Sequence, residues 1–177
     1  AEVRALPGVV AAAGASSTPY DGSTWVWTSD LADGSVVSVN MSAVGDGYFD
    51  VLGMRLVAGR GFAPDDVALD WKPLVIDREL ARAWFGDEDP IGRNPPFKPD
   101  DEGESQRNRV VGLVDDYRKD GELAGATNFA FPTLDLDYPK GNPYNTLVLR
   151  VAGTPPAGFE QELLAGLQRL APAWSFD

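Results

Sequence analysis

Residues 47–93 read GYFDVLGMRLVAGRGFAPDDVALDWKPLVIDRELARAWFGDEDPIGR, and this stretch decides the fold. Its run 74–76 predicts a short buried strand. Asp77 stands at the N-cap of the helix expected next, and Gly86 stands where that helix ends. The apolar residues of the helix recur at spacings of three and four, which places them on one face. The stretch is therefore rich in turn and cap signals, and it contains no catalytic motif.

The composition narrows the class of protein. The chain has 177 residues, no cysteine, no histidine and a formal net charge of −12. The missing residue types exclude disulfide bonds, zinc-thiolate sites and serine–histidine catalysis. The negative charge disfavours nucleic acid as a partner. No apolar run approaches the ~18 residues of a membrane span. We interpret the chain, which opens on Ala1, as a soluble domain excised from a longer protein.

Further elements are expected on both sides of the central stretch. Residues 25–28 and 36–44 alternate around the turn dipeptide Asp33-Gly34, which predicts a hairpin. Strands are also expected at 9–13, 110–114, 129–136 and 146–151, with Pro132 either making the third of these an edge strand or interrupting it. The apolar stripe of 155–170 predicts the longest helix. Strands and helices alternate irregularly, so the fold class is α+β with two lobes.

Several motifs suggest chemistry and fall short of it. The glycine pairs at 45–47 and 59–61 lack the third glycine of a dinucleotide-binding loop. Residues 87–92 resemble the start of a calcium loop, but Ile91 replaces an oxygen ligand and Lys98 stands where the closing glutamate belongs. Paired carboxylates at 115–116 and at Asp135 and Asp137 leave acid–base hydrolysis open as one possible function. We expect no catalytic residue, no metal site and no cofactor.

Three tryptophans are candidates for contact with a ligand or a partner. Trp25 and Trp27 are two residues apart in an expected strand, so their indoles share one face, and Trp71 ends an acidic loop. Indoles stack well on sugars and on apolar ligands, but packing in the core or between lobes is the more common use. Both interpretations stay open at this point.

An ordered series of motifs covers nearly the whole chain. It resembles the extracytoplasmic core domain of MacB/FtsX-like ABC transporter permeases. The matching segments are Leu6-Pro7-Gly8-Val9, the stretch from Tyr48 to Phe62 (YFDVLGMRLVAGRGF), Val75-Ile76-Asp77 with Ala81 and Phe85-Gly86, Asp89 to Arg93 (DPIGR), Val110 to Asp116 (VVGLVDD), Leu147 to Val151, and Leu167 to Trp174.

The resemblance implies a fold of two lobes. Residues 1–34 and 126–177 would form a porter-like βαβ lobe, and residues 35–125 an inserted, mixed α/β, Sabre-like lobe. Chain crossings near Gly34 and Gly125 would then allow hinge motion. The apolar side chains of the inserted lobe should be mostly buried; these are Tyr48, Phe49, Leu52, Leu56, Phe62, Leu80, Trp84 and Phe85.

The resemblance also implies a function and a location. The domain would lie on the extracytoplasmic, periplasmic face of the bacterial cytoplasmic membrane, between the first two transmembrane helices of a permease. It would be non-enzymatic and would pass ATPase-driven motion to a substrate or a partner. Its partners would be the membrane helices, a cytoplasmic ABC ATPase and, where the parent uses one, a periplasmic adaptor protein. The alternative is a domain that captures a peptide, lipid or glycan between the lobes.

Overall fold

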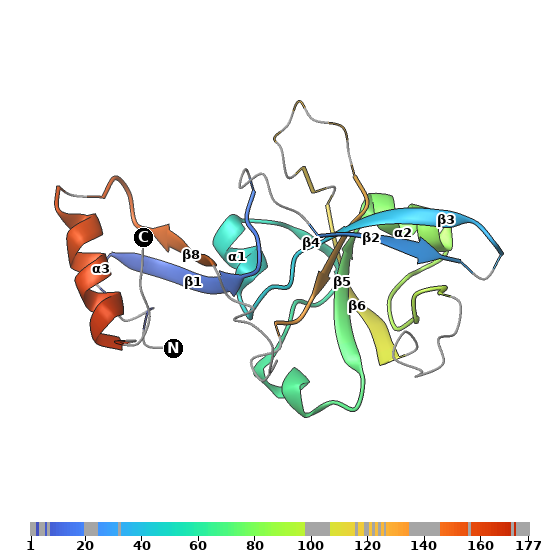
Figure 1. Cartoon of the computed structure of the whole chain (residues 1–177), viewed down its shortest axis with the longest axis horizontal. Helices are drawn as coiled ribbons and strands as arrows, with labels where there is room; N and C mark the ends of the chain where they lie inside the picture. Colours follow the sequence, from blue (N-terminus) through green and yellow to red (C-terminus); the bar gives the residue numbers. More distant parts are fainter. Residues whose placement is uncertain are drawn as a thin grey trace.

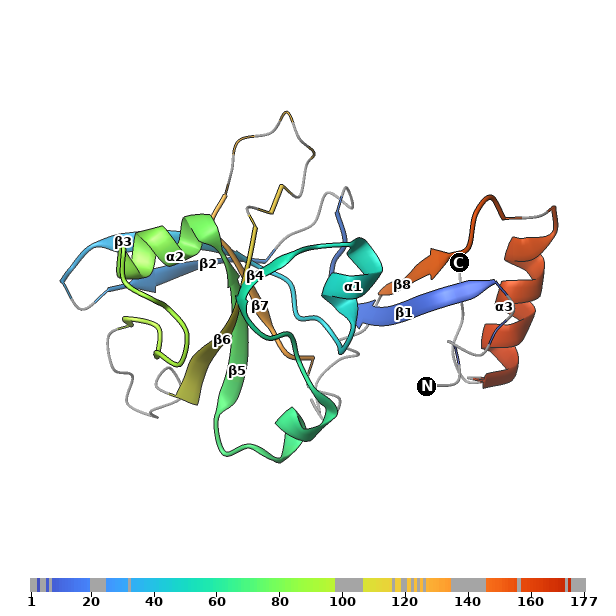
Figure 2. The same cartoon turned by 180° about the vertical axis from the view of Figure 1, so that it is seen from behind.

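The computed structural model describes residues 3, 6, 8–19, 25–31, 33–97, 107–115, 117–118, 121, 123, 125, 127–134, 146–155, 157–170 and 172. Figures 1 and 2 show two groups of elements on either side of the short helix α1. The elements are β1 (Val9–Ala15), β2 (Trp25–Asp30), β3 (Val36–Met41), α1 (Tyr48–Leu52), β4 (Leu56–Gly59), η2 (Pro64–Ala68), β5 (Lys72–Asp77), α2 (Arg78–Phe85), β6 (Asn108–Val114), β7 (Phe129–Pro132), β8 (Thr146–Val151) and α3 (Phe159–Leu170).

The larger group is a six-stranded mixed sheet with the order β2-β3-β7-β5-β6-β4. The pairs β3/β7 and β5/β6 are parallel, and the other neighbours are antiparallel. One face packs against α2 through Leu80, Ala81 and Trp84. The other face packs against α1 through Tyr48 and Phe49. Both faces are therefore covered, which explains why β5 and β6 consist of nearly continuous apolar residues.

The predicted passage from β5 into α2 is confirmed. Asp77 is fully buried, and its Oδ1 accepts a hydrogen bond from the Leu80 amide at 2.9 Å and from the Phe129 amide at 3.2 Å. One carboxylate thus caps the helix and also fixes the start of β7. At the other end, Gly86 donates its amide to the Arg82 carbonyl at 2.9 Å with φ of 62°.

Two glycines of the central motifs are explained by close backbone contact. Gly59 of β4 is opposite Gly112 of β6. A Cβ on Gly59 would lie 2.1 Å from the Val111 carbonyl oxygen, and a Cβ on Gly112 would lie 2.2 Å from the Arg60 carbonyl oxygen. No side chain fits at either position, so the glycines permit the β4–β6 pairing.

Of the two expectations for Pro132, interruption of the strand is confirmed, because β7 ends at this residue, and the edge position is wrong. β7 lies between β3 and β5, in the interior of the sheet. Pro132 is tolerated there because it is the last residue of the strand, where its missing amide costs little and its carbonyl still accepts from the Val44 amide at 3.0 Å. The interior position follows from pairing with residues far away in sequence.

The smaller group is a two-stranded antiparallel sheet of β1 and β8, with α3 beside it. The predicted boundaries after residues 34 and 125 do not follow this division, because β2 and β7 lie in the six-stranded sheet. Gly34 lies in the β2–β3 turn, and Gly125 lies between β6 and β7. The chain passes between the two sheets after β1 and after β7, so hinges at these glycines are not supported.

The central stretch is packed as expected. Of the eight apolar side chains predicted to be buried, none is exposed, and the most deeply buried are Tyr48, Phe49, Leu80 and Trp84. The predicted β2–β3 hairpin is also confirmed, with Trp25 opposite Met41 and Asp30 opposite Val36.

Candidate functional site

The three candidate tryptophans do not form one site. Trp25 is 83% exposed on β2, and Trp27 lies next to Phe97, with ring centroids 4.7 Å apart. Phe97 belongs to the apolar cluster on the α2 face of the sheet, whereas Trp71 packs against the cluster on the α1 face. The Trp71 ring lies under the Arg109 guanidinium at 4.8 Å. Contact of any of the three with a ligand or partner stays a prediction.

The feature that joins the two sheets is the segment 42–45 with its neighbours. Val44 forms an antiparallel bridge to Ala15 at the end of β1 and a parallel bridge to Thr133 after β7. The Ser16 amide donates to the Ala43 carbonyl, and the Gly45 amide donates to the Gly14 carbonyl, both at 2.9 Å. We call this segment with α1 and Arg150 the junction. Through it the hydrogen-bonded backbone is continuous from β1 to β7.

The side chains at the junction form one apolar core. The cluster on the α1 face includes Ala13 and Ala15 of β1 together with Phe129 and Phe131 of β7. α1 packs against β1 and β8 on its other side. Tyr48 and Phe49 of α1 lie 6.2 and 5.3 Å from the Phe131 ring, measured between ring centroids. The two sheets therefore share a core, and among the described residues the space between them at α1 is filled by side chains.

Arg150 connects β8 to α1. Its Nε donates a hydrogen bond to the Val51 carbonyl at 3.0 Å, at the end of α1. Gly53 follows with φ of 69°, and a Cβ there would lie 2.8 Å from the Arg150 guanidinium. The glycine thus ends the helix and leaves room for the guanidinium. A cation at a helix C-terminus also interacts favourably with the helix dipole.

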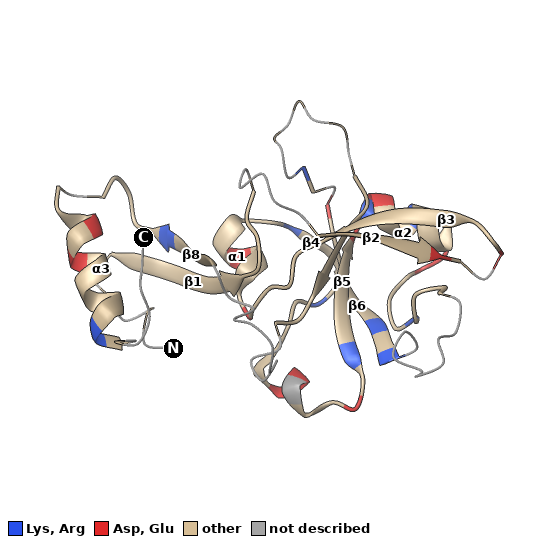
Figure 3. Ribbon diagram, in the orientation of Figure 1, with Lys and Arg blue, Asp and Glu red and all other residues tan. Residues whose placement is uncertain are grey.

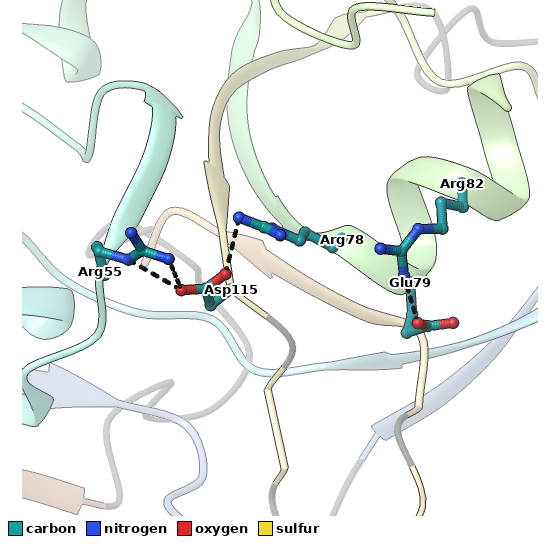
Figure 4. A network of polar contacts seen from close by, with 5 residues as sticks. All are labelled: Arg55, Arg78, Glu79, Arg82 and Asp115. Atoms are coloured by element: carbon teal, nitrogen blue, oxygen red, sulfur yellow. Dashed lines mark hydrogen bonds and ion pairs between the residues drawn. The ribbon is translucent and has the colours of Figure 1, made fainter. Parts of the chain in front are cut away.

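A cluster of charges binds three elements of the six-stranded side together (Figure 4). Asp115, just after β6, accepts from Arg55 at 2.6 and 3.0 Å and pairs with Arg78 of α2 at 3.0 Å. The hydrogen bonds from Arg55 hold the pKa of Asp115 below its ordinary value, and the charge of Arg78 acts in the same direction. Arg82 pairs with Glu79 one turn along the helix. Asp115 is thus an ionised ion-pair partner and not a proton donor.

A second ion pair fixes the turn after β4. Arg60 donates two hydrogen bonds to Asp66, at 2.7 and 2.8 Å, and Asp66 also accepts from the Ala63 amide at 2.8 Å. The hydrogen bonds from Arg60 lower the pKa of Asp66, although its burial acts in the opposite direction. The arginine of the Gly59-Arg60-Gly61 motif therefore has a structural role. The sequence indicated this motif only as an incomplete dinucleotide-binding loop and as part of the family pattern, so the ion pair was not predicted.

The remaining acidic residues considered for metal binding or catalysis either shape a turn or lie outside the described residues. Asp89 accepts from the Ile91 amide at 3.0 Å, so it shapes the turn that had resembled a calcium loop. Asp116, Asp135 and Asp137 lie outside the described residues. Within the described part of the chain, no group of three histidine, cysteine, aspartate or glutamate side chains is placed to hold a metal ion. In the same part, no helix is both long and apolar enough to span a membrane.

Two hollows in the described part of the chain lie on outer surfaces. One lies beside α2 and is lined by residues such as Val57, Arg78 and Glu88. The other lies between Leu6 and α3. Neither lies at the junction. Lys72, Arg107 and Arg109 lie where β5 and β6 begin, and the other basic residues, like the acidic ones, are distributed over the rest of the described chain (Figure 3).

The sequence is matched by a known family model. The model of the MacB-like periplasmic core domain matches residues 1–164, and the chain belongs to this family. It is thus an extracytoplasmic domain of the kind found in ABC transporter permeases, a class in which ATP is hydrolysed by another domain.

Curated relatives agree with this family. The macrolide export ATP-binding/permease protein MacB of Aggregatibacter actinomycetemcomitans is 29% identical over 138 residues, which are 78% of this chain and 18% of the relative. The protein of the same name from Neisseria gonorrhoeae is 28% identical over 139 residues, with the same coverage. The chain thus spans less than a fifth of the length of these relatives.

Solved structures share the fold. The periplasmic region of MacB from Actinobacillus actinomycetemcomitans has a TM-score of 0.65 at 18% identity, covering 95% of this chain and 70% of that one. The extracellular domain of the ABC-type transporter YknZ from Gram-positive bacteria has a TM-score of 0.63 at 14% identity, covering 96% and 80%. The resemblance read from the sequence motifs is therefore confirmed.

Proposed function

We propose that this domain is a non-enzymatic transmission element of an ABC transporter permease. It would pass motion driven by a cytoplasmic ATPase to a substrate or a partner outside the membrane. The observation that supports this proposal is the junction. A single apolar core and a continuous backbone ladder link β1 and β8 to the six-stranded sheet. Because packed interiors have low compressibility, displacement of one sheet displaces the other.

The arrangement of the described ends fits attachment at one side. Leu6 packs against Gly166 of α3, where a Cβ would lie 2.8 Å from the leucine, and Phe159 packs against Gly8. The chain therefore enters β1 and leaves α3 at the same place, and the β2–β3 hairpin lies at the opposite end of the molecule (Figures 1 and 2). Motion of flanking membrane helices would enter beside α3 and leave through the six-stranded sheet.

The alternative is capture of a peptide, lipid or glycan between the two sheets. Binding sites for such ligands are concave and largely preformed. The space between the sheets beside α1 is filled by Tyr48, Phe49 and Val51, which are all buried. The packing thus favours transmission over capture, and the two proposals predict different behaviour of variants at the junction.

The first experiment cross-links the two sheets at the junction with a disulfide bond. In the reconstituted parent transporter, Ala15→Cys combined with Val44→Cys places two thiols at an antiparallel pair. The hydrogen bonds of Ser16 and Gly45 flank this pair, so it is a non-hydrogen-bonded pair with Cα atoms about 4.5 Å apart, which suits a disulfide. This chain has no cysteine of its own. A macrolide is the first substrate to test, because the relatives are named as macrolide exporters. We expect the oxidised protein to keep both ATP hydrolysis and transport.

The second experiment loosens the junction. Arg150→Met removes the hydrogen bond to the Val51 carbonyl and should lower transport per ATP hydrolysed while ATP hydrolysis continues. Arg169→Met, on the exposed side of α3, is the matched control and should leave this ratio unchanged. Loss of transport on oxidation of the cysteine pair would show that the sheets must move apart, and would overturn the proposal. Specific micromolar ATP binding to this 177-residue chain would overturn the division of labour with a separate ATPase.

A further inference from the structure

The outer edge of β2 is an open sheet edge. β2 is the first strand of the six-stranded sheet and pairs only with β3. On its other side, pairing within the described residues is limited to an isolated bridge between Leu31 and Phe97, one residue beyond the strand. The residues of β2 itself, Trp25–Asp30, have no strand beside them in the described part of the chain.

The hydrogen-bond register shows which backbone groups face this edge. Val26 is opposite Asn40, and Thr28 is opposite Ser38. The Asn40 amide donates to the Asn128 carbonyl at 2.9 Å, and the Ser38 carbonyl accepts from the Asn128 side chain at 3.0 Å, so both residues direct their backbone groups away from β2. Because the pairs of an antiparallel ladder alternate, the N–H and C=O groups of Val26 and Thr28 point outward to the open edge.

The side chains along this edge are unusually apolar and exposed. Trp25 is 83% exposed, Val26 63% and Trp27 43%. In natural proteins, an edge strand is usually protected from pairing with another strand. The protection comes from a lysine, a proline or a bulge in the strand, or from the strand being very short. β2 has six residues in regular register, contains neither lysine nor proline, and has its only charge at Asp30. Open donors and acceptors beside exposed apolar side chains are the features of a surface that a partner covers.

We propose that the outer edge of β2 is a docking site for an extended, lysine- or arginine-bearing segment of a partner protein, which adds to the sheet as a further strand. The proposal rests on the proposed function for its setting outside the membrane. Alternate side chains of the added strand pack beside Trp25 and Trp27 on one face and beside Val26 on the other. Its basic residues lie near Asp30 and Asp33.

Charge and position select this occupant. The chain has a net charge of −12, so a second copy and an anionic membrane surface are both repelled in the mean field. Asp33 at the hairpin turn accepts from the amide and the hydroxyl of Ser35, at 2.9 and 2.6 Å. These bonds lower its pKa, so it stays ionised at neutral pH. The hairpin also lies at the end of the molecule away from α3, where the flanking membrane helices would attach.

The test uses the 177-residue chain and synthetic peptides as probes. The first probe is a capped peptide of alternating valine and lysine, the second alternates valine and glutamate, and the third is the lysine peptide with alternate amides N-methylated. Binding is titrated by tryptophan fluorescence, and the site is located by hydrogen exchange. We expect only the first peptide to bind and to slow exchange at Val26 and Thr28. The other two should bind at least about tenfold more weakly. The glutamate peptide has the wrong sign of charge for Asp30 and Asp33, and the N-methylated peptide lacks backbone N–H donors for the open edge.

Variants separate strand addition from general attraction. Thr28→Pro removes an outward N–H that the β3 pairing does not use, so the fold is kept and binding is lost. Trp25→Thr removes an exposed side chain and should weaken binding severalfold. Val36→Thr, an exposed valine on β3, is the control and should bind as the parent chain does.

Three outcomes would overturn the inference. These are equal binding of the N-methylated peptide, protection at residues outside β2, and self-association of the chain with Val26 and Thr28 protected, which would make a second copy the occupant. The measurement needs neither transport nor ATP, so its failure leaves the transmission proposal standing. A failure of the junction variants would likewise leave the β2 edge untouched.

Discussion

The two sheets differ in how much of their surface is packed. The six-stranded sheet has an apolar cluster on each face, and Val75, Ile76, Val110 and Phe131 are fully buried. The β1–β8 sheet is less completely covered: Ala12, Ala13 and Ala15 are buried, but Val10 is 59% exposed and Leu147 is 37% exposed. Among the described residues of α3, only Gly166 and Leu167 are buried.

This difference assigns separate roles to the two groups. A two-stranded sheet is marginally stable in water, so β1 and β8 are held by what they pack against. The contacts that hold them are those of the junction. The six-stranded sheet is the stable body. The β1–β8 sheet keeps its position relative to this body through its contacts with α1, Val44 and Arg150.

The largest effect is expected in the shared core. Phe131 is fully buried, with its ring centroid 5.3 Å from Phe49, 5.3 Å from Tyr117 and 4.8 Å from Phe129. Phe131→Ala leaves a cavity among these rings and should lower the free energy of unfolding by about 3–5 kcal/mol. Urea denaturation, monitored by tryptophan fluorescence, measures this change in the free energy of unfolding.

The matched substitution in the smaller group is Leu167→Ala. Leu167 is 6% exposed, but most of α3 around it faces solvent. Its loss should cost no more than about 2 kcal/mol, since the site has room to relax. If both substitutions lowered the stability equally, α3 would belong to the same packed body as β7, and the comparison would fail.

The second prediction concerns the junction alone. Arg150→Met keeps an apolar stem and removes the hydrogen bond to the Val51 carbonyl. Losing a hydrogen bond from a charged donor should cost about 1–2 kcal/mol of local opening free energy. Hydrogen exchange should therefore speed up at Ala13 and Val148, which are paired in the β1–β8 sheet, and stay unchanged at Val75 in β5. Equal acceleration in both sheets would mean that they unfold as one unit.

Local signals in the sequence predicted the elements of the stable body well. Asp77 and Gly86 marked both ends of α2, Asp33-Gly34 marked the hairpin, and the motifs between Gly47 and Arg93 identified the family. These features depend on neighbours within a few residues. Propensity and capping act over that range.

The junction was not predictable in the same way. Val44 joins residues 15 and 133, and Arg150 reaches an acceptor 99 positions earlier. No local pattern encodes such a partner, so the division into lobes was drawn at turn glycines and not at the true passages between sheets. The interior place of β7 was not predictable for the same reason: the end of the strand at Pro132 follows from a local preference, but its neighbours β3 and β5 are distant in sequence.

The smallest effect is a dependence of stability on pH that belongs to the six-stranded side. Among the described residues, the carboxyls with lowered pKa are Asp33, Asp66 and Asp115, and none lies in β1, β8 or α3. The ordinary pKa of Asp66 is 3.8, and its pKa in the folded protein is lower. Above 3.8 the carboxyl is ionised in both states, and the ion pair with Arg60 contributes fully. As the pH falls below 3.8, the unfolded chain binds the proton first, so this contribution is lost until the folded carboxyl is protonated too.

Asp66→Asn should therefore flatten the acid side of the curve of unfolding free energy against pH, while lowering the stability near neutrality. The other two carboxyls titrate in both proteins, so the difference between the curves isolates Asp66. Asp65→Asn is the control, because Asp65 is exposed and forms no ion pair with any described residue. Urea titrations from about pH 6 down to about pH 2 cover both the plateau and the fall in stability below pH 3.8. Identical slopes for Asp66→Asn and the parent chain would place the acid sensitivity elsewhere. Acid that released the β1–β8 sheet first, seen as faster exchange at Val148, would show that the junction and not the six-stranded body is its target.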